Sequence, residues 1–86
     1  MVHFPKSVQI GSAGDAHVLR DTATGNQYEL TAAETRMAEL LLAGDSIDDC
    51  IRILVEEQGI PEETIRRDLL AFITKLRHHQ LAEEAE

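Results

Sequence analysis

The chain has 86 residues, of which 43% are hydrophobic and 28% charged, a composition typical of a single globular domain and not of a disordered segment. Its formal net charge of −8 disfavours binding to nucleic acid and to anionic membranes, because both associations depend on cationic side chains. The sequence contains no apolar run long enough to span a membrane, no signal peptide and only one cysteine. We therefore expect a cytoplasmic protein with one domain over residues 1–86, a core at about 6–81 and a frayed acidic tail at 82–86.

Three short segments near the start of the chain predict strands. Residues 7–10 and 27–30 alternate polar and apolar side chains, and residues 16–21 can form a strand between them. The glycine-containing segments 11–15 and 24–26 are typical of turns. The pattern predicts an antiparallel meander, which needs a layer of helices over one face to be stable.

Two helices with clear end signals follow. Thr31 and Glu34 form a capping box for the first helix, and Gly44 is a natural terminator. Ser46 is the expected cap of the second helix, which ends at Gly59. The predicted core stripe of the first helix is Ala33, Met37, Leu40 and Leu41.

The third helix is expected to run from Pro61 to about His78, since proline suits a first helical position. Its predicted core stripe is Ile65, Leu69, Phe72, Ile73 and Leu76. Strands followed by helices indicate an α+β domain, here winged helix-turn-helix-like, with a three-stranded antiparallel sheet followed by three helices.

Catalytic chemistry has little support in the sequence, which has no phosphate-binding loop, no nucleophile elbow and no metalloprotease motif. Cys50 lies on an apolar helical stripe, where an inert buried thiol is expected. His78 and His79 point about 100° apart on a helix, so they cannot easily share a metal ion. We expect no enzyme activity, no catalytic residue, no metal and no cofactor; a small enzyme that depends on Cys50 is a rival hypothesis.

The open sheet favours peptide binding instead. Residues 27–30 form a short segment without proline, and an unpaired strand edge can accept a guest strand. Leu70 lies off the core stripe of the third helix, beside Arg66 and Ile73, where it either lines a groove or is simply an exposed leucine. We expect a binding groove between the third strand and the third helix.

The ordered segments 18–21, 24–31, 43–49, 65–69 and 72–76 resemble the PqqD-like family, the small proteins and domains called RiPP recognition elements. The resemblance extends from about Lys6 to Leu81 and includes two departures. The chain has no tryptophan, which many relatives carry near the third strand, and Gln80 stands at a position where relatives commonly have glycine.

This resemblance implies a non-catalytic adaptor that binds the leader of a ribosomally synthesised precursor peptide as an added antiparallel strand and presents it to a modifying enzyme. It places backbone pairing on Gln27, Tyr28, Glu29 and Leu30, and groove walls on Arg66, Leu69, Leu70 and Ile73. The short format is similar to the recognition proteins of lasso-peptide pathways, whose partner is a separate cysteine peptidase. A radical SAM enzyme is the alternative partner, in which case the chain would be a chaperone for pyrroloquinoline quinone biosynthesis.

Two further hypotheses belong to other classes of function. A winged-helix transcription regulator would use the third helix to contact DNA, although the acidic residues of the second and third helices disfavour it. A self-associating structural protein would pair its open edge with that of a second copy.

Overall fold

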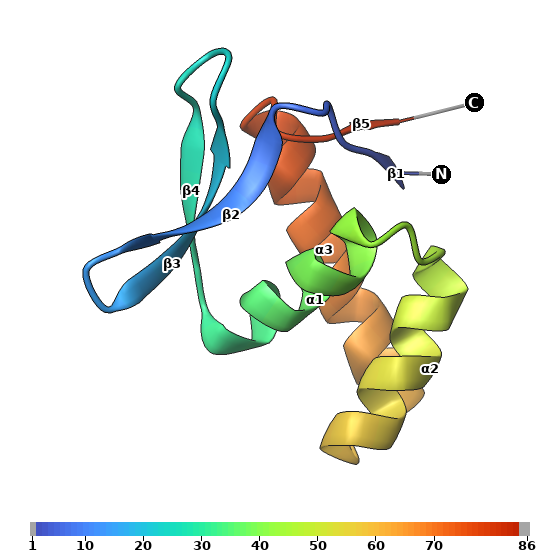
Figure 1. The fold of residues 1–86 in the computed structure, drawn as a ribbon. Coiled ribbons are helices and arrows are strands. Elements are labelled where there is room, and N and C mark those ends of the chain that lie inside the picture. Colours follow the sequence, from blue (N-terminus) through green and yellow to red (C-terminus); the bar gives the residue numbers. More distant parts are fainter. Residues whose placement is uncertain (1, 85–86) are drawn as a thin grey trace.

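The computed structural model describes residues 2–84 and has the expected α+β architecture, in which the three strands of the main sheet precede the three helices (Figure 1). The elements are β1 (Val2–His3), β2 (Val8–Ala13), β3 (Ala16–Asp21), β4 (Gln27–Leu30), α1 (Ala32–Leu42), α2 (Ile47–Gln58), α3 (Glu62–His78) and β5 (Glu83–Glu84). The three-stranded sheet lies to one side and the three helices to the other, so the apolar face of the sheet is covered by helices. The predicted fold class is confirmed.

The main sheet is an antiparallel meander with strand order β2-β3-β4. β2 is longer than expected, because Gly11, Ser12 and Ala13 continue the pairing with β3 as far as Ala16. The turn predicted for residues 11–15 is therefore reduced to Gly14 and Asp15, and Gly14 takes the positive φ of 64° that such a tight reversal requires.

The predicted ends of α1 and α2 are present, whereas α3 begins one residue later than predicted, at Glu62, with Pro61 as its N-cap. The Thr31 side chain accepts a hydrogen bond from the Glu34 amide at 3.1 Å, and the Glu34 carboxylate accepts one from the Thr31 amide at 3.0 Å. Ser46 caps α2 by accepting from the Asp49 amide, and Gly59 ends it with a φ of 66°. These caps satisfy backbone groups that a helix leaves without partners at its ends, and so fix where each helix begins and stops.

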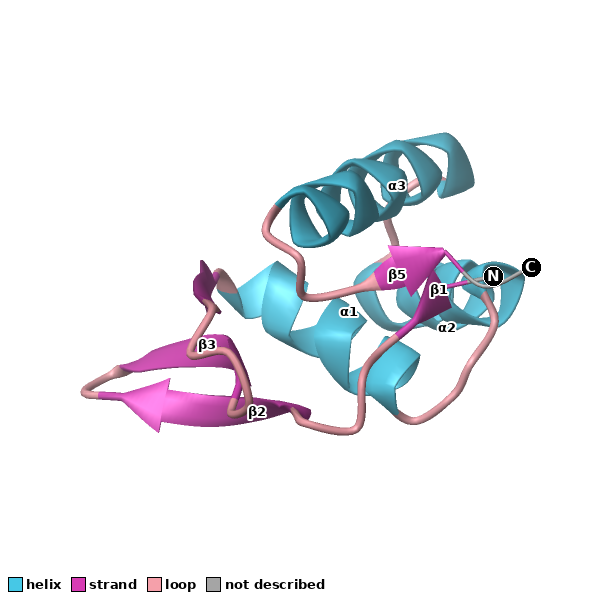
Figure 2. Cartoon of the chain, turned by 90° about the horizontal axis from the view of Figure 1, so that it is seen from above, coloured by secondary structure: helices cyan, strands magenta, loops and turns pink. Residues whose placement is uncertain are grey.

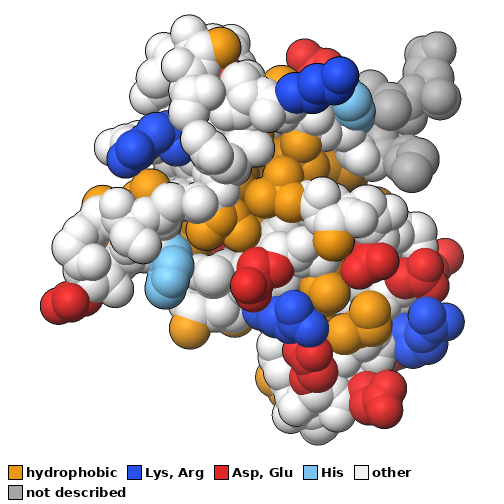
Figure 3. Space-filling model, in the orientation of Figure 1, with side chains coloured by type: hydrophobic (Ala, Val, Ile, Leu, Met, Phe, Trp, Pro, Cys, Tyr) orange, Lys and Arg blue, Asp and Glu red, His pale blue; other side chains and the backbone are white. Residues whose placement is uncertain are grey.

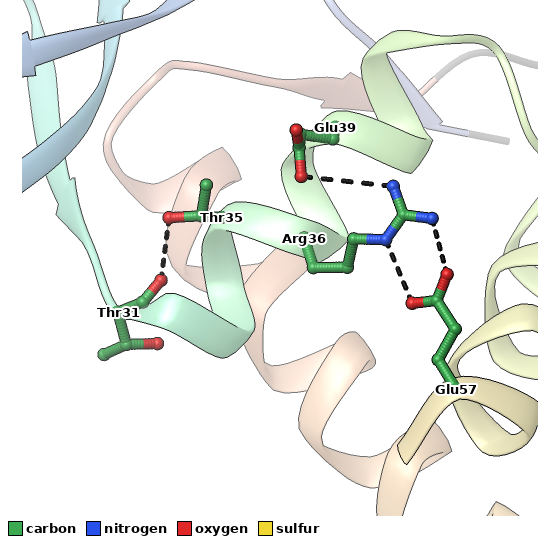
Figure 4. A network of polar contacts seen from close by, with 5 residues as sticks. All are labelled: Thr31, Thr35, Arg36, Glu39 and Glu57. Atoms are coloured by element: carbon green, nitrogen blue, oxygen red, sulfur yellow. Dashed lines mark hydrogen bonds and ion pairs between the residues drawn. The ribbon is translucent and has the colours of Figure 1, made fainter.

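One hydrophobic core joins the inner face of the sheet to all three helices. Its fully buried members include Leu19 of β3, Leu54 of α2 and Leu69 of α3. On the helical surface, the Arg36 guanidinium of α1 makes two hydrogen bonds, of 3.0 and 2.6 Å, with the Glu57 carboxylate of α2, and it also approaches Glu39 (Figure 4). This pairing raises the pKa of Arg36 and lowers that of Glu57.

The end of the chain differs from expectation. Ala82 is buried, and Glu83 and Glu84 pair with His3 and Val2 in a small two-stranded sheet beside the helices (Figure 2). The predicted frayed tail is therefore wrong for 82–84, while the last two residues lie outside the described part of the chain. This pairing gives hydrogen-bond partners to backbone N–H and C=O groups near the end of the chain. It was not predicted because the segment has no strand pattern and its partner lies at the other end of the sequence.

Candidate functional site

The outer edge of β4 is free. In the described chain, 2–84, β4 pairs only with β3, and β1 and β5 form their own sheet. The hypothesis of peptide binding requires an unpaired strand edge. No other segment of the described chain pairs with this edge of β4.

The direction of the backbone groups along β4 follows from its pairing. The Asp21 amide donates to the Asn26 carbonyl at 2.8 Å, which makes these two residues a hydrogen-bonded pair. Hydrogen-bonded and non-hydrogen-bonded pairs alternate in an antiparallel ladder, so Tyr28 and Leu30 direct their backbone groups at β3. The N–H and C=O groups of Gln27 and Glu29 therefore point outward, toward the free edge.

The free edge ends at Thr31. Its amide donates to the Glu34 carboxylate, and its carbonyl accepts from the Thr35 amide at 2.8 Å and from the Thr35 hydroxyl at 2.9 Å (Figure 4). Because these groups are occupied by the first turn of α1, a guest strand can form backbone hydrogen bonds only with Gln27 and Glu29.

Tyr28 connects this strand to the helices. Its ring packs against the ring of Phe72 in α3, with the centroids 6.3 Å apart, and against that of His79, which directly follows α3, with the centroids 5.2 Å apart. Its hydroxyl donates to Glu34 Oε2 at 3.2 Å. Burial and the nearby carboxylate both raise the pKa of Tyr28, so the phenol stays protonated and can keep donating.

A hollow of about 250 Å³ lies where β4 meets the helices. Its walls come from the start of α1 and from one flank of α3; the lining residues are Thr31, Ala33, Glu34, Met37, Asp68, Ala71, Phe72 and Lys75. Methionine, phenylalanine and two alanines supply an apolar surface, and the charged side chains stand among them. Such a hollow suits an apolar side chain of modest size.

A second hollow, of about 450 Å³, lies near the other end of β4, beside Asn26. Its lining is more polar and includes Asp21, Thr24, Arg77 and Gln80. Asp21 is itself only 4% exposed, and hydrogen bonds from the Ser7 hydroxyl and the Ala23 amide lower its pKa. The edge of β4 thus runs between an apolar and a polar hollow.

The sequence-predicted residues of α3 fall into two groups. Leu69 and Ile73 are buried in the core, with 0% and 4% of their surface exposed. Arg66 faces α2, since its guanidinium lies 3.7 Å from the Asp48 carboxylate, and Leu70 follows it one turn later at 44% exposure. At 100° per residue, Leu70 is about 160° from Phe72, so the structure does not bring Arg66 and Leu70 to the β4 side of the helix.

Several residues that line the apolar hollow were not predicted as site residues. Ala33 was expected on the core stripe of α1 but is exposed at the mouth of the hollow. Asp68, Ala71 and Lys75 were not among the predicted site residues. The ring of Phe72 packs against Tyr28 of β4, and at 100° per residue Asp68, Ala71 and Lys75 lie on one side of Phe72, away from Leu69 and Leu76.

The chemistry of the described residues is that of a binding surface. Burial raises the pKa of the Cys50 thiol to about 11, so it is a poor nucleophile at neutral pH. Residues 2–84 contain no group of three or more His, Cys, Asp and Glu side chains placed to hold a metal ion. Within the same residues, no helix has both the length and the apolar composition needed to cross a membrane.

Two solved structures have the same fold. One, titled "TbiB1 in Complex with the TbiA(beta) Leader Peptide", matches with a TM-score of 0.83 at 25% identity and covers 98% of each chain. The other, "Lasso peptide synthetase B1 complexed with the leader peptide", has a TM-score of 0.81 at 22% identity and covers 96% of this chain and 98% of its own. A search of curated proteins gave no match.

The family model described as "Coenzyme PQQ synthesis protein D (PqqD)" matches residues 16–82, which include the three-stranded sheet from β3 onward and all three helices. That range includes β4, the whole apolar hollow and the polar hollow except for Pro5 and Glu83. The resemblance drawn from the sequence is confirmed: this chain belongs to the PqqD family.

Proposed function

We propose that the protein binds the leader segment of a ribosomally synthesised precursor peptide, which adds to β4 as a fourth, antiparallel strand. The free edge of β4 is the observation that carries this proposal, because an unpaired strand is a template for another backbone. The proposal is supported by membership of the PqqD family and by two proteins of the same fold that are titled as leader-peptide complexes.

Backbone pairing alone is too weak to account for recognition. Gln27 and Glu29 offer four hydrogen bonds, each with a net value of about 0.5–1.5 kcal/mol, hence roughly 2–6 kcal/mol in all. Association itself costs an estimated 4–15 kcal/mol, so side chains of the guest must supply the remainder. The hollow beside Phe72 provides an apolar surface for one of them.

The site we propose consists of residues 27–30 and the helix flank that faces them. In an antiparallel complex the guest residues nearest Leu30 precede those nearest Gln27, so the apolar hollow receives a side chain from the N-terminal part of the bound segment. Leu69 and Ile73 support this flank from within the core. Arg66 and Leu70 would be engaged only if the guest crossed to the α2 side of α3.

In this proposal the protein acts as an adaptor without chemistry of its own. It holds the precursor while a separate modifying enzyme, such as a leader-cleaving cysteine peptidase, acts on it. A radical SAM enzyme is the alternative partner, as in pyrroloquinoline quinone biosynthesis. Both assignments place the protein in the cytoplasm, where precursor peptides are made.

The experiment is a titration with the leader encoded beside the gene for this chain, followed by isothermal calorimetry and by amide NMR. Saturable binding with slowed exchange of the Gln27 and Glu29 amides is expected. Ala71→Glu should weaken binding at least tenfold, because it places a charge in the apolar hollow. Leu70→Glu is the matched control, since it makes the same change to an exposed residue on the opposite flank.

The two variants distinguish the two flanks of α3 as the binding surface. Loss of binding in Leu70→Glu but not in Ala71→Glu would move the site to the flank with Arg66 and Leu70, which the family resemblance places in the groove. Binding that leaves the Gln27 and Glu29 amides unchanged would refute strand addition at β4.

A further inference from the structure

We infer that the segment bound at β4 carries a lysine or arginine at the residue opposite Glu29, so that Glu29 selects the guest by charge. This inference rests on the proposed function and adds to it the chemical class of the peptide. It depends on three features of β4: the direction of its backbone groups, the isolation of the Glu29 carboxylate and the different surroundings of its two faces.

The backbone of Glu29 fixes which guest residue lies opposite its side chain. Because its N–H and C=O point at the free edge, a guest residue that pairs there exchanges two hydrogen bonds with it. Directly paired residues place their side chains on the same face, with Cβ atoms about 4.5–5.5 Å apart. The side chain opposite Glu29 therefore emerges next to the carboxylate, on the face of the sheet away from the core.

The Glu29 carboxylate has no partner among the described residues. The residue beside it on β3 is Val18, which is apolar. Arg20, two residues after Val18 on β3, donates to the Gln27 side chain at 3.3 Å. Glu29 is exposed and engaged in no hydrogen bond or ion pair with residues 2–84, so its charge is available to a guest.

The surrounding charge favours the same chemistry. The chain has a net charge of −8, and acidic side chains are prominent on its surface, especially over α2 in the lower right of Figure 3. A cationic segment is drawn toward such a protein, whereas an acidic one is repelled. At the edge of β4, the Glu29 carboxylate favours a cationic side chain at the guest residue opposite it.

The neighbouring positions of the guest meet a different environment. Residues opposite Tyr28 and Leu30 lie on the core-facing side of the sheet, where the aromatic ring of Phe72 and the apolar hollow are found. The inferred recognition sequence is therefore a basic residue flanked on both sides by apolar residues. This pattern differs from a plain hydrophobic motif, and it can be read directly from selected peptides.

The test is selection from a displayed library of random twelve-residue peptides, with the wild-type chain and two charge-reversal variants as targets. Glu29→Lys reverses the charge of the residue that we infer to select the guest. Glu63→Lys makes the same change at an exposed residue in the first turn of α3, which forms no hydrogen bond or ion pair with the described residues. Peptides that bind are then measured individually at 50 and 500 mM salt.

We expect the wild-type chain and Glu63→Lys to select Lys or Arg between two apolar residues, and Glu29→Lys to select Asp or Glu at that position. Replacing the selected cation by glutamine should weaken binding about two- to fivefold at low salt, in the range of a cross-strand ion pair. The difference should shrink at high salt because the pair is exposed.

The outcomes separate this inference from the proposed function. Peptides that bind at β4 without a charge preference, or with the same preference in Glu29→Lys, overturn the inference and leave strand addition standing. Failure to select any peptide that protects the Gln27 and Glu29 amides overturns both.

Discussion

The backbone at Gln80 offers a quantitative test of the structure. Gln80 follows α3 with a φ of 61°, and Gly59 ends α2 with a φ of 66°. Both residues adopt the left-handed conformation that reverses the chain after a helix, and the Leu81 amide closes the turn by donating to the Leu76 carbonyl at 2.8 Å. Only one of the two positions has the residue that tolerates this conformation without strain.

Gln80→Gly should therefore stabilise the protein. The left-handed conformation costs a residue with a side chain about 1–2 kcal/mol, and the extra backbone entropy that glycine loses offsets about 0.5–1 kcal/mol of the gain. At the midpoints of these two ranges the net gain is about 0.75 kcal/mol. For 86 residues at about 2.1 cal/mol/K of unfolding entropy each, Tm should rise by roughly 3–6 °C.

Gly59→Ala is the matched control because it introduces the same strain at a second helix end. No heavy atom lies within 4 Å of a Cβ built at Gly59, so any destabilisation comes from the backbone conformation and not from a clash. Thermal unfolding followed by circular dichroism should show a Tm decrease of similar size. A Gln80→Gly variant with unchanged or lower Tm, beside a destabilised Gly59→Ala, would refute this account of the α3 end.

Three other predictions concern stability. Thr31→Ala should lower the free energy of unfolding by about 1 kcal/mol in urea titrations, because the capping box loses its side-chain acceptor; an unchanged midpoint would contradict the cap. Leu19→Ala should cost about 2–5 kcal/mol, since Leu19 is fully buried, and a smaller loss would mean that the core collapses around the cavity. Asp21→Asn should be less stable than the wild type at pH 7. The native pKa of Asp21 is below its ordinary value of 3.8, so the difference should shrink as the pH falls through that range, and a pH-independent difference would show that the carboxylate charge is not involved.

The sequence was sufficient to predict the helices because their ends carry local chemistry. Thr31 with Glu34, Ser46 and Gly59 act on backbone groups within one turn, and a signal of that range can be read without knowing the fold. The three-stranded sheet could be predicted for a similar reason, since alternation of polar and apolar residues and turn residues are also local signals. The extension of β2 to Ala13 was not predicted because its last residues are small and show no strand pattern. Backbone pairing with β3 makes them part of the strand.

The candidate site was predicted in part. The free edge of β4 followed from strand order, but the wall opposite it depends on how α3 is rotated about its axis. Leu70 was predicted as a groove residue because it lies off the core stripe, whereas the hollow is lined by two buried core residues, Met37 and Phe72, by two alanines and by polar residues common on a solvated surface. The direction of the Gln27 and Glu29 backbone groups also required the register of β3 against β4, which no single residue encodes.

The pairing of β1 with β5 brings the beginning and the end of the described chain together on the side of the molecule opposite β4, as both ribbon views show. A fluorescent label, an affinity handle or a whole enzyme domain joined to either end would thus project away from the open strand. A domain joined at β1 or β5 would therefore leave the edge of β4 uncovered.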